Sequence, residues 1–135
     1  MVSKNEFPKE FGGIVSGFRN GNIWIIVDFE IPNNYKNSKT NFTRDVIKIN
    51  SYLKKNYKNS GGLIEYLGEW HTHPLGDAYY SQNDLVSMRE IAIDKKVIIE
   101  TPLLFIFSLQ TDFTNLIAYQ FHKDELIILE KKDYL

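Results

Sequence analysis

The chain contains no cysteine in its 135 residues. It therefore cannot carry a disulfide scaffold, a thiolate-ligated metal or a cysteine nucleophile. Long apolar runs are missing as well: no stretch approaches the length of a membrane span, and residues 1–15 lack a signal-peptide pattern. We expect a soluble, cytoplasmic protein that has no membrane partner.

Charge of either sign is not in excess, because the formal net charge is -1 and the lysines are spread along the chain. This balance argues against nucleic acid as a partner. The hydrophobic content of 43%, with 14% aromatic residues, is enough for a core without covalent staples. The length fits a single domain over residues 1–135.

Hydrophobic patterning predicts the secondary structure. A helix over 44–57 is indicated by Val46, Ile49, Leu53 and Tyr57 at spacings of three and four, and a second helix opens near Ser81 and runs to about residue 92. Strands are predicted at 11–18, 22–30, 63–73, 97–109, 113–122 and 125–132, with a polar loop over 31–41, a hairpin turn at Asn20-Gly21 and another at 123–124. The predicted fold class is α/β, a mostly antiparallel sheet flanked by two helices.

Two histidines and an acid lie close together in the stretch GEWHTHPLGDAYYSQND, residues 68–84. On a strand, residues i and i+2 share a face, so His71 and His73 project side by side, and Pro74 stops the strand directly after them. Asp84 falls in the first turn of the next helix. Two imidazoles and a carboxylate form a three-ligand set typical of catalytic zinc.

Each half of this pattern also has a structural interpretation. The histidines could be solvated, and the segment SQND fits a capping box in which Ser81 is the N-cap and Asp84 the N3 acid. Both halves together, in this order, favour a metal site. The two interpretations are compatible, because an acid in the first turn can also face an ion.

Hydrolysis at such a site needs a general base. Glu10, Glu69 and Asp77 are candidates, and spacing alone leaves the choice open. Glu69 shares the strand face of His71 but could equally be a carboxylate that supports the ligands. Tyr79 and Tyr80 lie beside the site, where they could line a substrate groove or pack the loop.

The motifs HTHP (71–74) and SQND (81–84), six residues apart, together with PKEFGGIVSG (8–17), resemble the signature of the JAB1/MPN/Mov34 (JAMM) zinc metallopeptidases. The resemblance implies a JAB/MPN (cytidine deaminase-like) domain with one zinc ion per chain, held by His71, His73 and Asp84. It implies that Glu10 is the general base and that Ser81 donates to the oxyanion. Family members often have proline before the motif serine, where this chain has Tyr80.

The segments YLGEWHTHP and FTRD are similar to the prokaryotic JAB branch. That likeness implies an isopeptidase acting after the C-terminal tail of a ubiquitin-like or otherwise conjugated protein, in a CBASS-type antiviral operon with E1- and E2-like partners. We expect the extended tail to add as a strand to a sheet edge near the site. The alternatives are a peptidase that trims a small sulfur-carrier protein, and a non-catalytic MPN-type scaffold, which the complete motif disfavours. Deaminase chemistry would need a Cys-x-x-Cys pair, which the chain lacks.

Overall fold

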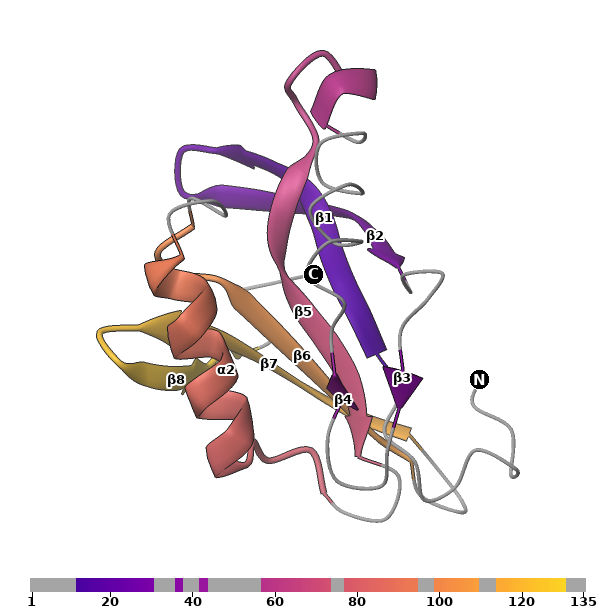
Figure 1. Ribbon diagram of the computed structural model, residues 1–135, viewed down its shortest axis with the longest axis vertical. Helices are drawn as coiled ribbons and strands as arrows, with labels where there is room; N and C mark the ends of the chain where they lie inside the picture. Colours follow the sequence, from indigo (N-terminus) through magenta and orange to yellow (C-terminus); the bar gives the residue numbers. More distant parts are fainter. Residues whose placement is uncertain are drawn as a thin grey trace.

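The computed structural model describes residues 12–30, 36–37, 42–43, 57–73, 77–94, 99–109 and 114–130. Six strands form one sheet in the order β2-β1-β5-β6-β7-β8, and helix α2 lies across one face (Figure 1). The bounds are β1 Gly12–Asn20, β2 Ile23–Glu30, β5 Glu65–His73, α2 Gln82–Ile93, β6 Leu103–Leu109, β7 Thr114–His122 and β8 Glu125–Ile128.

Only β5 and β6 pair in parallel, and the other neighbours in this sheet are antiparallel. This arrangement confirms the predicted α/β class with a mostly antiparallel sheet. No helix among the described residues is long and apolar enough to cross a membrane.

The hairpins follow from residues that tolerate unusual backbone angles. Asn20 pairs with Ile23, so the two loop residues are Gly21 and Asn22, one position later than the predicted Asn20-Gly21 turn. The shift places Gly21, with φ of 62°, at the first loop position, where a II′ turn requires glycine. Between β7 and β8, Lys123 and Asp124 have φ of 48° and 69°, the signs that a type I′ turn demands.

The first predicted helix is described only at its end, since most of the range 44–57 lies outside the described residues. Residues 57–59 are helical. Gly61 and Gly62 then adopt φ of 67° and 85°, and their N–H groups donate to the carbonyls of Lys58 and Tyr57. This bond pattern is a Schellman cap, so Gly61 and Gly62 end the helix.

The polar segment 31–41 differs from the prediction of a simple loop. β3 (Lys36–Asn37) pairs antiparallel with β4 (Phe42–Thr43) in a separate two-stranded sheet. Hydrophobic patterning missed these strands because each is only two residues long.

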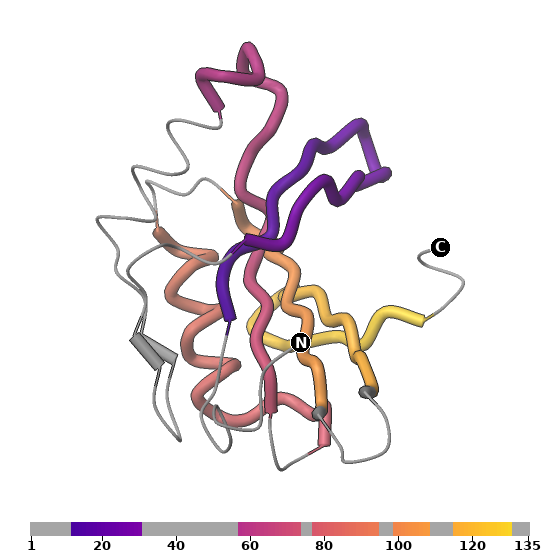
Figure 2. The backbone as a smooth tube through the Cα atoms, turned by 90° about the vertical axis from the view of Figure 1, so that its right-hand side faces the viewer, coloured from indigo at the N-terminus to yellow at the C-terminus, as the bar shows by residue number. Residues whose placement is uncertain are grey.

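The main core lies between the sheet and α2. Met88 and Ile91 of the helix are buried against a cluster that includes Ile14, Leu104 and Tyr119 from the sheet. In the side view of Figure 2, the helix lies on one side of the strands. Burial of each large apolar side chain contributes about 1.5–3 kcal/mol, which holds α2 in place over the sheet.

The other face of the sheet carries aromatic side chains. Trp70 is half-buried there and packs edge-on against Phe29 and Phe107, with ring centroids 6.5 Å and 6.0 Å away. Trp70 alternates with His71 along β5, so the tryptophan belongs to the packing on one face while the histidine points to the other.

Candidate metal centre

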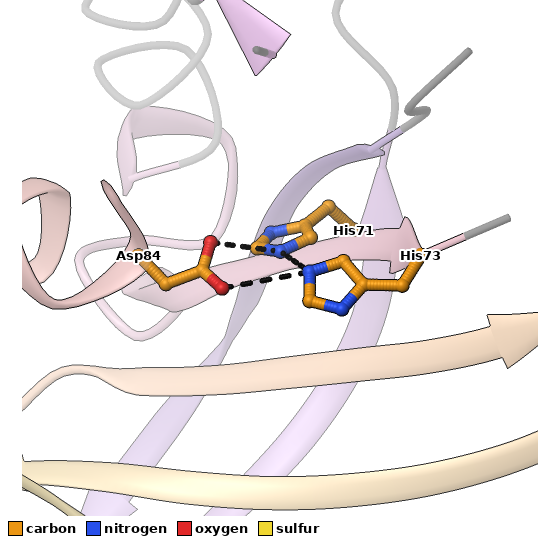
Figure 3. A group of neighbouring side chains, drawn as sticks. All are labelled: His71, His73 and Asp84. Atoms are coloured by element: carbon orange, nitrogen blue, oxygen red, sulfur yellow. Dashed lines mark hydrogen bonds and ion pairs between the residues drawn. The ribbon is translucent and has the colours of Figure 1, made fainter. Parts of the chain in front are cut away.

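His71 and His73 lie at the end of β5 and face the side of the sheet that α2 covers (Figure 3). Their ring centroids are 5.0 Å apart. The strand is held on both sides at this point, because His71 pairs with Gly12 of β1 and His73 with Ser108 of β6. The two imidazoles are therefore fixed by an interior strand, not by a loop.

Gly12 allows β1 to approach His71 closely. A Cβ at position 12 would lie 2.3 Å from the carbonyl oxygen of Trp70 and 2.7 Å from the Cβ of His71. Any side chain would push β1 away from β5, so glycine is required for the sheet to close behind the first histidine.

The start of α2 supplies the acid. Ser81 is the N-cap: its Oγ accepts from the Asp84 N–H at 3.2 Å, and its own N–H donates to Asp84 Oδ2 at 2.7 Å. This reciprocal pair confirms the predicted capping box. The box also fixes the rotamer of Asp84, whose carboxylate is turned toward the histidines (Figure 3).

The three side chains converge on a common point. His71 Nε2 lies 3.0 Å from Asp84 Oδ1, His73 Nε2 lies 3.5 Å from Asp84 Oδ2, and the two Nε2 atoms are 3.2 Å apart. Ligands at about 2.0–2.2 Å from one tetrahedral zinc ion are separated by roughly 3.4 Å. The donor types and their spacing fit zinc, and among the described residues these three form the one such group of histidine and acid side chains.

The electrostatics favour an ionised Asp84. Burial opposes its charge, but the interactions of the carboxylate with His71, His73 and the Ser81 N–H outweigh burial and hold the pKa of the carboxyl well below its ordinary value of 3.8. The carboxylate is therefore negative at neutral pH, the state that a metal ligand needs.

The second nitrogen of His73 determines which atom faces the metal position. His73 Nδ1 lies 2.9 Å from the backbone carbonyl oxygen of Asp77. A carbonyl can only accept, so Nδ1 carries the proton and donates. In the neutral ring Nε2 then has its lone pair directed at His71 and Asp84, which is the tautomer a metal ligand at Nε2 requires.

Glu69 points along the sheet toward a tyrosine. It is 7% exposed and accepts a hydrogen bond of 2.8 Å from the hydroxyl of Tyr66. Tyr66 and Glu69 share a face because the register between β1 and β5 shifts at this point, leaving Leu67 as an extra residue in β5. Glu69 is outside the group of converging ligand atoms.

Three further predicted residues, Asp77, Tyr79 and Tyr80, lie on the segment between His73 and Ser81. The Asp77 carboxylate accepts from the Tyr79 N–H at 3.0 Å. Tyr80 packs its ring edge-on against Tyr119 of β7, whereas the Tyr79 ring is 60% exposed. Glu10 and Pro74 lie outside the described residues.

Sequence reasoning did not identify Tyr119. Tyr119 lies two residues before Phe121 on β7, so the two side chains share a face, and both are buried. A buried tyrosine hydroxyl normally has a partner. That partner is the segment 77–80, about forty residues earlier in the chain, and no local pattern indicates it.

Within the main sheet, no edge strand lies beside the histidines, where we expected the substrate's tail to add as a strand. The edges of the main sheet are β2 and β8, and β5 lies between β1 and β6. β2 is two strands from β5, about 10 Å away at the usual strand spacing.

Comparison with known proteins gives three findings. The family described as prokaryotic homologs of the JAB domain matches residues 2–121. A protein of Escherichia coli (strain TW11681) named CD-NTase/cGAS isopeptidase is 35% identical over 66 residues, which cover 48% of this chain and 42% of that relative. The solution structure of a Desulfitobacterium hafniense protein superposes with a TM-score of 0.70 over 94% of this chain and 80% of the other, at 23% identity, a likeness of fold alone.

Proposed function

The chain belongs to the family of prokaryotic homologs of the JAB domain, and we propose that it is a zinc-dependent isopeptidase or peptidase. It cleaves after the C-terminal tail of a ubiquitin-like or otherwise conjugated protein. The observation that carries the proposal is the convergence of His71, His73 and Asp84, whose ligand atoms lie within 4.8 Å of one another.

One zinc ion would be held by the Nε2 atoms of His71 and His73 and by the carboxylate of Asp84. When bound, the ion supplies Lewis acidity, which polarises the scissile carbonyl and acidifies water at the site. The protein's part is to hold the two imidazoles in the tautomer that presents Nε2 and to keep Asp84 ionised.

Ser81 can cap the helix and act on the substrate at the same time. A hydroxyl has one donor and two acceptor lone pairs, and the cap uses only an acceptor, toward the Asp84 N–H. The hydroxyl proton can therefore be donated to the scissile carbonyl oxygen as that oxygen becomes negatively charged. Ser81 is exposed, so a substrate can reach it.

Glu10 is the general base of the proposed reaction. It precedes Gly12 by two residues, and Gly12 pairs with His71, so covalent geometry keeps the Cα of Glu10 within about 7 Å of the Cα of Gly12. The carboxylate accepts a proton from the attacking water and passes it to the leaving amine. The C–N bond breaks, leaving a free carboxylate on the tail and an amine on the target.

We place the substrate's tail beside Tyr79, which is exposed and lies two residues before Ser81 in the chain. The isopeptidase name of the Escherichia coli relative favours a protein substrate from a conjugation system. For this chain we propose a role in a CBASS-type antiviral system, with E1- and E2-like partners.

The test is cleavage of a modifier fused at its C-terminus to a reporter protein, with and without a chelator. Cleavage should stop with chelator and return when zinc is restored. His71→Ala should lose both bound zinc and turnover. His122→Ala, the matched change at the exposed third histidine, should retain both. Cleavage that persists in the metal-free protein would reject the zinc mechanism.

A further inference from the structure

The segment between the second histidine and Ser81 is anchored to β7 by one side chain. Tyr119 is fully buried, and its hydroxyl donates to the Ala78 carbonyl at 2.8 Å and accepts from the Tyr80 N–H at 3.1 Å. The ring of Tyr80 stands edge-on to that of Tyr119, with centroids 5.4 Å apart. Ala78 itself is buried, so its carbonyl depends on a protein donor.

The anchored segment in turn contacts the metal centre at both of its ends. On one side, the Asp77 carbonyl accepts from His73 Nδ1 at 2.9 Å, one residue before the Ala78 carbonyl that Tyr119 holds. On the other side, Tyr80 precedes Ser81, whose N–H donates to the Asp84 carboxylate. One hydroxyl thus fixes the backbone between two ligands that come from different elements.

We propose that Tyr119 is a positioning residue of the metal centre: it holds segment 77–80 so that the Asp77 carbonyl orients the His73 ring. The proposal rests on the proposed function in that His73 is taken as a metal ligand through Nε2. Without a fixed acceptor at Asp77, the proton of the neutral imidazole can sit on either nitrogen, and part of the population would present the wrong atom.

The chemistry of the tyrosine suits this task. The hydroxyl must donate to one backbone group and accept from another, which phenylalanine cannot do. Burial raises the pKa of Tyr119 to about 12, so the hydroxyl remains protonated and able to donate across the physiological range.

Tyr119→Phe tests the proposal, because it removes the hydroxyl and keeps the ring against Tyr80. The control is Phe121→Leu, a core change two residues further along β7 and on the same face of the sheet. Zinc affinity is measured by competition with a chelator, the His73 tautomer by ¹⁵N NMR of the metal-free protein, and stability by thermal melting. Asp77→Ala, which removes the side-chain tether to Tyr79 at an exposed position, serves as a second variant.

The expected result is a zinc affinity weakened about 10- to 100-fold in Tyr119→Phe, with an increased share of Nε2-protonated His73. Asp77→Ala should shift the tautomer in the same direction, and Phe121→Leu should change neither value. Unchanged zinc affinity in Tyr119→Phe, or an equal loss in Phe121→Leu, would overturn the proposal. If the wild-type protein binds no zinc, the proposed function fails, and the His73 tautomer alone decides the role of Tyr119.

Discussion

Replacement of Ser81 separates its structural role from its proposed chemical role. The cap consists of the Ser81 Oγ accepting from the Asp84 N–H, while the second bond of the box uses the backbone N–H of residue 81. Any residue except proline at position 81 keeps that second bond. Asparagine also supplies a side-chain oxygen that caps well, whereas alanine does not.

The two roles of Ser81 predict different changes in stability and in kcat. Ser81→Ala should cost about 1 kcal/mol of unfolding free energy, or about 3–5 °C in Tm for a chain of this length. Ser81→Asn should leave Tm near that of wild type, because the cap persists and the exposed position accepts the larger side chain. Both variants lose the hydroxyl donor, so both should lose about 10²–10³ in kcat, equivalent to about 2.7–4 kcal/mol.

The assay measures kcat on a cleavable modifier fusion, zinc content and thermal melting on the same samples. Substrate affinity should change little, because the donor acts on charge that develops during the reaction. A zinc-loaded Ser81→Asn enzyme with normal Tm and near-normal kcat would refute the reasoning. It would reduce Ser81 to a helix cap and weaken the peptidase proposal.

Three further predictions concern the surroundings of the same site. Glu10→Gln should abolish turnover while zinc is retained. Glu69→Gln should keep much more activity, because the Glu69 carboxylate already accepts a hydrogen bond from the Tyr66 hydroxyl. An inactive Glu69→Gln together with an active Glu10→Gln would make Glu69 the general base. Because the pKa of Asp84 is lowered, its contribution to stability is complete above 3.8 and is lost as pH falls below that value. The Tm of the metal-free wild type should therefore fall more steeply in acid than that of Asp84→Asn. Gly12→Ala should cost about 1–3 kcal/mol in denaturant melts, since its Cβ would overlap the Trp70 carbonyl; unchanged stability would mean that β1 can shift freely.

The parts of the site that the sequence predicted are those in which neighbouring residues act within one regular element. His71 and His73 share a face because strand side chains repeat every two residues. Ser81 and Asp84 form a capping box because a serine at the N-cap and an acid three residues later can each bond to the backbone N–H of the other. The fold class followed in the same way from hydrophobic periodicity, and all six strands of the main sheet were predicted. β6 begins six residues later than predicted and β8 ends four residues earlier, whereas the other ends differ by at most two residues.

Predictions that depended on register were less accurate. The first hairpin turn is one residue later than its Asn-Gly signal, because pairing of Asn20 with Ile23 sets the loop. The contact between Tyr66 and Glu69 could not be anticipated either. Alternation places residues 66 and 69 on opposite faces, and only the extra residue at Leu67 brings them together.

The sequence by itself determined which side chains can be ligands and which local element presents each one, since those properties depend on spacings of two or three residues. Tertiary structure alone decided that the first turn of α2 faces the end of β5, that Asp77 offers its carbonyl to His73, and that Tyr119 fixes the segment between them. These relations join groups that touch only after the sheet has closed and the helix has packed on it. They depend on burial and backbone register summed over the whole chain, which no short motif encodes.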